Sequence, residues 1–241
     1  MRALFFVYGA ISYMLFLVAF LYCAGFVANF VVPKSIDDGL ESPLSTALTI
    51  NLLLLGLFGI QHSVMARPGF KAWWTRLVPR PIERSTYVLL TSLILLLMFW
   101  QWRPMTSVVW NVENPALGGV LWTLCGAGWL LVLYSTFVIN HFDLFGLRQV
   151  FLNMRGVEYT HPKFSEKSVY CWVRHPLMAG FMVAFWATPT MSQGHLLFAV
   201  VTTVYALVGI QLEERDLMRQ LGPAYEEYRQ RIPMLLPLKK R

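Results

Sequence analysis

The sequence predicts an all-α, polytopic membrane protein with about six transmembrane helices. Its composition, its uncharged runs and the placement of its basic residues support this prediction. Of the 241 residues, 56% are hydrophobic and 14% are charged, whereas soluble domains are about 45–50% apolar and about 25% charged. A soluble chain with so few charges could not cover its own core. Despite a net charge of +7, the composition therefore excludes a soluble globular enzyme, a disordered chain and a nucleic-acid-binding protein.

Four uncharged runs each predict one membrane-crossing helix, which takes about 20 apolar residues. The first run predicts a helix over residues 4–30. We expect this helix to be retained, because no small-residue cleavage site follows its apolar stretch. Trp100 and Trp102 end the third run and suit the membrane interface. The four runs cover residues 3–33, 42–66, 85–102 and 114–142.

The fifth uncharged run, residues 175–212, is too long for one membrane-crossing helix and short for two. Its middle, residues 189–195, reads Pro-Thr-Met-Ser-Gln-Gly-His, which is typical of a turn. We therefore expect a tight hairpin of two short helices over residues 177–189 and 196–212. No internal repeat or Pro/Ser-rich linker divides the chain, so we expect one integral-membrane domain over residues 1–241.

The basic residues between the runs predict the orientation of the chain. Eighteen of the 20 Lys and Arg residues lie before the first run, in the loops of residues 67–84 and 143–174, or after residue 212. Lys34 and Arg103 are expected in the loops on the opposite side of the membrane. Cytoplasmic loops carry the excess of Lys and Arg, so both termini and both large loops are expected in the cytoplasm. The loop residues expected to contact anionic membrane lipids are His161, Lys163 and Lys167.

The sequence lacks the signatures of metal sites and of soluble nucleotide-binding folds. Its three cysteines form no C-x-x-C motif and its five histidines form no H-x-x-x-H pair, so we expect no disulfide framework and no metal. Gly126 and Gly128 lie within an uncharged run, without the third glycine of a dinucleotide-binding loop. They favour close packing of helices instead.

A first polar motif begins the expected hairpin. It runs from Tyr170 to Gly180 and contains Arg174, His175 and Pro176. Proline suits the first turn of a helix, which would place Arg174 and His175 at the cytoplasmic mouth of that helix. There they could reach an anion or an adenine edge. Alternatively, they are an arginine and a histidine that snorkel at a helix end.

A second polar motif follows the hairpin. Glu213 and Glu214 come before the Gly-Pro pair at residues 222–223, which predicts the end of a helix. Two adjacent carboxylates at a membrane boundary can bind a cation or a pair of hydroxyls. Alternatively, they form ordinary Glu–Arg pairs on a solvated helix. A tail with the pattern Gly-x-x-Tyr-x-x-Tyr-x-x-x-Ile-Pro follows.

Together, the two motifs resemble the isoprenylcysteine carboxyl methyltransferase-like superfamily over residues 170–237. These membrane-embedded enzymes use S-adenosyl-L-methionine, so the resemblance implies that cofactor, bound within residues 140–237. The superfamily often has a tyrosine where this chain has Met178, so this position lacks that aromatic ring. The residues implied for cofactor binding are Tyr170, Arg174, His175, Pro176, Leu177, Gly180, Glu213, Glu214, Tyr225, Tyr228 and Arg231.

Three further stretches, residues 59–67, 83–88 and 140–149, resemble the bacterial methanethiol methyltransferases. This resemblance implies a small thiol substrate, methanethiol, which is methylated to dimethyl sulfide with release of S-adenosylhomocysteine. It also implies a multi-pass location in the bacterial inner membrane. NnrU-type membrane proteins share part of the pattern. Two other interpretations stay open, namely a methyltransferase for a lipid or prenyl-type substrate and a non-enzymatic NnrU-like protein.

Methylation of a thiol needs a thiolate. The thiol of free cysteine has a pKa of about 8.5, so a base or a cation should help to form the thiolate. Histidine is the usual proton carrier near neutral pH. His62 could alternatively be a buried histidine bonded to a neighbouring helix, whereas His141 could form an oriented pair with Asp143. The candidates for this catalytic step are His62, Arg84, His141, Asp143 and Arg148.

Overall fold

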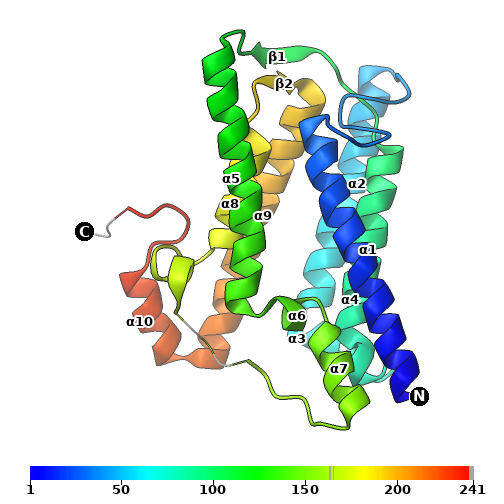
Figure 1. The fold of residues 1–241 in the computed structure, drawn as a ribbon, viewed down its shortest axis with the longest axis vertical. Helices are drawn as coiled ribbons and strands as arrows, with labels where there is room; N and C mark the ends of the chain where they lie inside the picture. The colour runs from blue at the N-terminus through cyan, green and yellow to red at the C-terminus, as the bar shows by residue number, and fades with distance from the viewer. Residues whose placement is uncertain (163, 165, 239–241) are drawn as a thin grey trace. The chain divides into compact units, whose positions relative to one another are not determined.

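The computed structural model describes residues 1–162, 164 and 166–238, so Lys163, an expected lipid contact, lies outside the described residues. Within this part of the chain, five helices are long and apolar enough to cross a membrane, and one apolar helix, α8 (Pro176–Trp186), is shorter (Figure 1). This confirms the prediction of an all-α, multi-pass membrane protein. The long helices are α1 (Arg2–Ala28), α2 (Leu44–Ala66), α4 (Arg80–Gln101), α5 (Pro115–Ile139) and α9 (Gln193–Leu221).

The chain folds as two compact units, each built from two separate stretches of sequence. The first unit comprises residues 1–106 and 140–163, and the second comprises residues 107–139 and 164–241. The chain therefore enters the second unit just before β1 (Val108–Asn111), returns to the first after α5, and enters the second again before α8. The expectation of one integral-membrane domain for the whole chain stays a prediction.

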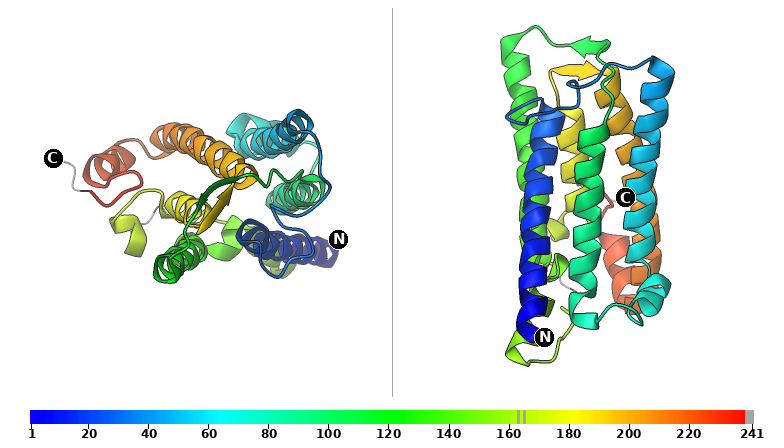
Figure 2. Two further views of the ribbon diagram at one scale, coloured as in Figure 1. Left: turned by 90° about the horizontal axis from the view of Figure 1, so that it is seen from above. Right: turned by 90° about the vertical axis from the view of Figure 1, so that its right-hand side faces the viewer.

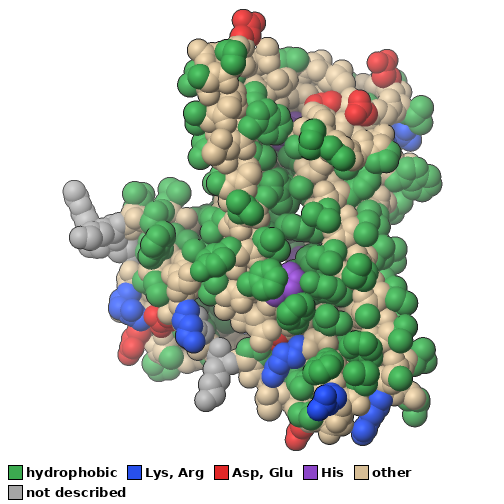
Figure 3. All heavy atoms as spheres, in the orientation of Figure 1, with side chains coloured by type: hydrophobic (Ala, Val, Ile, Leu, Met, Phe, Trp, Pro, Cys, Tyr) green, Lys and Arg blue, Asp and Glu red, His purple; other side chains and the backbone are tan. Residues whose placement is uncertain are grey.

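In the first unit, α1 packs against α4 and α7 (Leu147–Arg155), and α2 packs against α4. The backbone of α1 comes close to α7 at Gly9, where a Cβ atom would lie 2.5 Å from Val150 Cγ2. Figure 3 shows hydrophobic side chains along α1, and Lys and Arg side chains at the end where α1 begins. This distribution is the one expected for a helix that enters a membrane from its basic side.

The loop between α1 and α2 bonds the C-terminal end of α4. The indole Nε1 of Trp102, a fully buried residue, donates a hydrogen bond to the Ile36 carbonyl at 3.1 Å. Lys34 Nζ donates to the carbonyls of Trp100 and Trp102. These carbonyls belong to the end of α4, where the helix itself supplies no partner. Lys34, one of the two basic residues expected outside the cytoplasm, therefore caps the C-terminal end of α4.

In the second unit, α5 packs along α8. Gly128 of α5 meets Gly180 of α8, because a Cβ atom on Gly128 would lie 2.7 Å from both Ala184 N and Gly180 O. A Cβ atom on Gly126 would meet open space. The expected close packing of helices is thus confirmed at Gly128, whereas Gly126 takes no part in it.

The hairpin of α8 and α9 forms as expected, but its helix lengths differ from the prediction. The turn holds strand β2 (Thr190–Ser192), which pairs antiparallel with β1 (Val108–Asn111). The Ser192 side chain caps α9 by accepting a hydrogen bond from His195 N at 3.1 Å. The second hairpin helix was expected to end at residue 212, which is wrong, because loss of hydrophobicity does not stop a helix. It continues to Leu221, and the Gly-Pro pair at residues 222–223 ends it as predicted, with Gly222 at a φ of 57°.

Gly128→Ala is expected to destabilise the second unit, because its Cβ would overlap the backbone of α8 rather than a flexible side chain. Overpacking of this kind costs about 1–3 kcal/mol. Gly126→Ala, on the same helix, is the matched control and is expected to be neutral or slightly stabilising. Thermal unfolding of both variants in detergent checks the prediction. Equal melting temperatures for the two variants would contradict the packing described here.

Candidate active site

Arg174, His175 and Glu214 meet at the mouth of the hairpin in the second unit. Arg174 and His175 lie between the 3₁₀ helix η1 (Ser168–Cys171) and α8, and Glu214 lies near the end of α9. All three residues are buried, with 7%, 6% and 9% exposure. Arg174 Nε donates to Glu214 Oε1 at 2.7 Å, and His175 Nε2 lies 3.0 Å from the same oxygen. The two polar motifs thus form one buried ionic cluster.

The same arginine holds the C-terminal segment. Helix α10 (Pro223–Arg231) lies beside the end of α9 (Figure 2). Arg174 Nη1 donates to the backbone carbonyl of Arg229 at 3.1 Å and to that of Ile232. The backbone N–H of Arg174 donates to the Pro233 carbonyl at 2.9 Å. Arg174 therefore holds the C-terminal segment in place, a role that the sequence did not indicate. Its contact with a cofactor stays a prediction.

Two other groups in the cluster can still take up a ligand. The Glu213 side chain is 51% exposed, and its Oε2 lies 3.8 Å from His175 Nδ1. Tyr225 is 1% exposed, and its hydroxyl has no hydrogen-bond partner of normal geometry within the described residues. Burial, together with Glu214 and Glu213 and against the effect of Arg174, raises the pKa of Tyr225 to about 12. The phenol is therefore protonated at neutral pH and can donate a hydrogen bond.

Tyr170, Tyr228 and Arg231 connect α10 to the segment before α8. The Tyr228 hydroxyl donates to the Tyr170 carbonyl at 2.7 Å, and the Tyr170 hydroxyl lies 3.4 Å from the Ser135 carbonyl. Burial raises the pKa of both phenols. Arg231 Nη2 forms a surface ion pair with Glu166 Oε2 at 2.8 Å. Each of the three expected ligands thus has a partner within the protein, and their cofactor contacts stay predictions.

Pro176, Leu177 and Gly180 form the beginning of α8. Pro176 occupies the first turn, as expected. Leu177 is half-buried. A Cβ atom on Gly180 would lie 2.8 Å from Gly128 O, so helix packing alone requires glycine there. Cofactor contacts of these three residues stay predictions.

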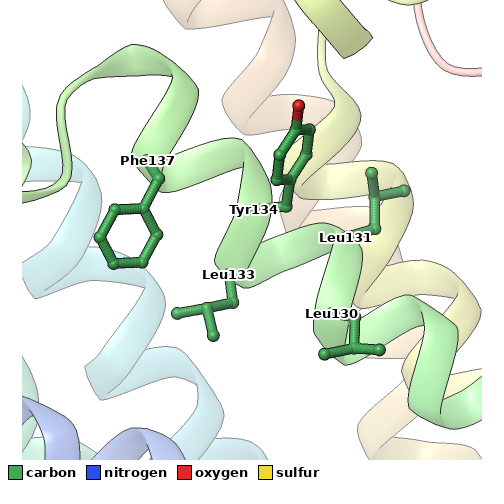
Figure 4. Close-up of a pocket in the computed structure, with 5 residues that line it drawn as sticks. All are labelled: Leu130, Leu131, Leu133, Tyr134 and Phe137. Atoms are coloured by element: carbon green, nitrogen blue, oxygen red, sulfur yellow. The ribbon is translucent and has the colours of Figure 1, made fainter.

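An apolar depression lies on the surface of α5 (Figure 4). Its volume is about 520 Å³. Its lining surface is apolar, and the Tyr134 hydroxyl is engaged elsewhere, 2.7 Å from Ser168 Oγ. Such a surface suits the hydrocarbon part of a lipid or an apolar substrate. The lining residues are Leu130, Leu131, Leu133, Tyr134 and Phe137.

In the first unit, His62 of α2 belongs to a polar network with α4. The Tyr87 hydroxyl lies 2.9 Å from each ring nitrogen of His62, and Thr91 Oγ1 lies 3.4 Å from Nδ1. The Phe58 ring stacks on the imidazole with centroids 5.3 Å apart. Arg84 Cζ lies 6.0 Å from the Tyr87 ring centroid. His62 therefore bonds a neighbouring helix, as its alternative interpretation held, and its part in proton transfer stays a prediction.

His141 is buried in an aromatic environment, with 3% exposure. Its Nε2 lies 2.8 Å from the hydroxyl of Tyr13, a residue of α1. The rings of Phe16, Phe142 and Phe145 lie within 6.4 Å of the imidazole, centroid to centroid. Burial lowers the pKa of His141, because the charged imidazolium loses its hydration. The ring is therefore neutral at neutral pH and able to accept a proton.

Asp143 lies in the same short helix as His141, α6 (His141–Leu144), but its carboxylate bonds elsewhere. Arg148 Nη1 donates to Oδ1 at 2.8 Å, and the Tyr159 hydroxyl donates to Oδ2 at 3.2 Å. Arg148 also donates to the Thr160 carbonyl at 2.8 Å. The expected orienting bond between His141 and Asp143 is thus replaced by an arginine–carboxylate pair, which is a stronger partnership for a carboxylate. In this arrangement, Tyr13 orients the imidazole.

Sequence reasoning missed three residues that contact the candidates. Tyr13 and Tyr87 each lie beside a candidate histidine, and Arg229 Nε lies 3.5 Å from Glu214 Oε2. The two tyrosines did carry a signal, since each places a hydroxyl inside an uncharged run, where a polar group needs a partner. Arg229 gave no such signal in the sequence, because it belongs to a charged helix in which any arginine could face water.

The chain matches the family described as NnrU protein over residues 50–235. It belongs to this family. A methanethiol S-methyltransferase from Mycobacterium tuberculosis is 58% identical over 98% of this chain and 97% of that protein. Methanethiol S-methyltransferase 1 from Bradyrhizobium diazoefficiens is 56% identical over 98% of this chain and 82% of that protein. Nurim from Mus musculus is 30% identical over 73% of this chain and 70% of that protein. No solved structure matches.

The NnrU match covers parts of both compact units. It begins within α2 and ends after α10, so it includes the Arg174 cluster as well as the candidates near His62 and His141. Most of α1, with Tyr13, precedes it. The two methyltransferases extend the similarity to 98% of the chain.

Proposed function

We propose that this NnrU-family protein transfers a methyl group from S-adenosylmethionine to methanethiol and releases dimethyl sulfide and S-adenosylhomocysteine. The observation that carries the proposal is the 58% identity to a methanethiol S-methyltransferase over 98% of the chain. The buried ionic cluster at the end of α9 supports it as a place for a charged cofactor. The similarity to bacterial methanethiol S-methyltransferases favours the bacterial inner membrane, and the placement of the basic residues favours a cytoplasmic position for both termini and this cluster.

The residues near the end of α9 fit S-adenosylmethionine, which supplies a sulfonium-bound methyl group when bound. Glu213 offers a half-exposed carboxylate that can accept hydrogen bonds from ribose hydroxyls or from an amino group. Tyr225 offers a buried hydroxyl donor. Glu214 is already engaged by Arg174 and His175, so we assign cofactor contact to Glu213 and structural support to Glu214.

The thiol must lose its proton before its sulfur attacks. We assign the acceptance of this proton to a neutral imidazole, and His141 is the leading candidate because burial keeps it neutral. The electron pair that the S–H bond leaves on the thiolate sulfur forms the new bond to the methyl carbon, and the electron pair of the old carbon–sulfur bond stays on the departing sulfur. Opposite charges disappear in this step, so an apolar environment favours it. His62, held by Tyr87, is the alternative acceptor.

Production of dimethyl sulfide tests the proposed function. Cells that lack thiol methylation would express the chain, receive methanethiol, and have their headspace sampled. We expect dimethyl sulfide from the native chain and from Glu227→Gln, an exposed carboxylate of α10, but about tenfold less from Glu213→Gln at limiting cofactor. No dimethyl sulfide, together with no thermal stabilisation by S-adenosylhomocysteine, would favour a non-enzymatic NnrU-like protein.

A second candidate is a methyltransferase for a lipid or prenyl-type substrate. The apolar surface of α5 around Leu130 and Tyr134 favours it, since a hydrocarbon chain could lie against this surface. Mass spectrometry of total lipids from the same cells separates the two candidates. A methylated lipid that depends on Glu213, with no dimethyl sulfide, would replace methanethiol as the substrate.

A further inference from the structure

The short helix α3 (Pro68–Trp74) lies at the edge of two membrane-crossing helices. It follows α2, which ends at Ala66, and it precedes α4, which begins at Arg80. Figure 2 shows α3 at the end of α2, beside the start of α4. Because α2 and α4 both cross the membrane, the segment that joins them lies where hydrocarbon gives way to lipid headgroups.

One side of this segment is fixed to the protein. The Phe70 and Trp74 rings pack on the buried cluster of Met65, Tyr87 and Val88, which belongs to α2 and α4. The Phe70 and Trp74 centroids are 5.7 Å apart. These contacts hold α3 in place on the first unit, so the side chains on its other side have a defined position.

The other side of the segment exposes large apolar side chains. Trp73 is 50% exposed and Leu77 is 66% exposed. Tryptophan is favoured at the boundary between hydrocarbon and headgroups, where its ring can face lipid and its N–H can face polar groups. A soluble anion would gain nothing from these two side chains, whereas a lipid would contact them with its glycerol and upper acyl carbons.

Basic side chains belong to the same segment. Arg76 and Arg80 are exposed, and Lys71 is half-buried. Within the described residues, none of these three side chains forms an ion pair with a carboxylate. Burial, Arg84 and Arg67 lower the pKa of Lys71, and Glu83 offsets them in part. The Lys71 ammonium thus faces an excess of positive charge, which a bound anion would relieve.

We propose that Lys71, Arg76 and Arg80, with Trp73 and Leu77, bind the headgroup of an anionic phospholipid. The phosphate accepts hydrogen bonds from the basic side chains while the two apolar side chains contact the hydrocarbon below it. Basic residues gather on the same face as the termini, so the lipid belongs to the leaflet that the positive-inside rule makes cytoplasmic. The assignment is independent of the proposed methyl transfer.

Native mass spectrometry of the detergent-purified full chain tests this site, with phosphatidylglycerol and phosphatidylcholine of matched acyl chains as probes. We expect the native chain to retain phosphatidylglycerol preferentially. Lys71→Gln/Arg76→Gln/Arg80→Gln should lose this preference, with about fivefold weaker binding for each charge removed. Equal retention of both lipids by the native chain, or unchanged preference in the triple variant, would overturn the proposal.

Two controls separate this site from general charge effects. Arg2→Gln/Arg155→Gln/Arg219→Gln removes the same charge at other exposed positions and should keep the lipid preference. If the triple variant at α3 unfolds in detergent, Arg76→Gln/Arg80→Gln, which changes exposed side chains alone, should still weaken binding by more than tenfold.

Two further measurements identify what the site recognises. Inorganic phosphate should raise the melting temperature of the native chain less than phosphatidylglycerol does, and equal stabilisation would overturn the lipid assignment. Binding of S-adenosylhomocysteine should be the same in the native chain and in the triple variant. Joint loss of lipid and S-adenosylhomocysteine binding would instead assign these cations to the cofactor and overturn the proposal.

Discussion

Glu214→Gln is expected to lower the free energy of unfolding by about 3–5 kcal/mol, because it leaves the buried Arg174 guanidinium without its carboxylate. The change also replaces the charged oxygen that His175 faces with an amide, and it weakens the ion pair between Glu214 of α9 and Arg229 of α10. We therefore expect loss of methyl transfer together with a lower melting temperature. Thermal unfolding in detergent and protease sensitivity after Gly222 measure the two structural effects.

Glu213→Gln provides the matched control, since it changes the adjacent glutamate, whose side chain is half exposed. It should keep the native melting temperature and bind S-adenosylhomocysteine about tenfold more weakly. Adding Arg174→Gln to Glu214→Gln should restore part of the lost stability, because no unpaired charge then stays buried. If both single variants lose stability equally, or neither does, the division of labour between the two glutamates is wrong.

The sequence was sufficient to predict the fold class and the hairpin because these follow from hydrophobicity and from strong stop signals. Long uncharged runs become helices that cross a membrane, and Pro176 and Gly222 mark helix ends through their backbone chemistry. The hairpin helix expected over residues 196–212 instead continues to the stop at Gly222, because a helix continues as long as its residues tolerate helical geometry. Charge at Glu213 and Glu214 sets where a helix leaves the membrane, not where it ends.

The sequence predicted where the candidate site lies better than it predicted which groups bond one another there. The motifs at Arg174 and Glu214 predicted that the two ends of the hairpin matter, and the structure brings them within hydrogen-bonding distance. What Arg174 bonds could not be predicted, because its partners include backbone carbonyls, which every residue possesses. The orienting partner of His141 is Tyr13, more than one hundred residues away in sequence, and such a pairing depends on how α1 packs.

His141→Gln is expected to change the pH dependence of methyl transfer, because the reaction would lose its proton acceptor. Burial lowers the pKa of His141 below its ordinary value near 6.5, so the native imidazole stays neutral, and the enzyme active, down to that lowered pKa. Below it, protonation should abolish proton acceptance. In the variant, activity at pH 7 should fall by about 100-fold or more.

The variant should then recover as the pH rises, by about tenfold per unit, until the thiol ionises by itself, at or above the pKa of about 8.5 of free cysteine. A purely structural role of His141 would lower activity equally at every pH. Tyr13→Phe should keep the native profile with a modest loss of rate, since it removes the hydrogen bond at Nε2 and leaves the imidazole in place. If His62→Gln shows the pH-dependent recovery and His141→Gln does not, then His62 accepts the proton. In that case Tyr87, which bonds His62, orients the proton acceptor in place of Tyr13.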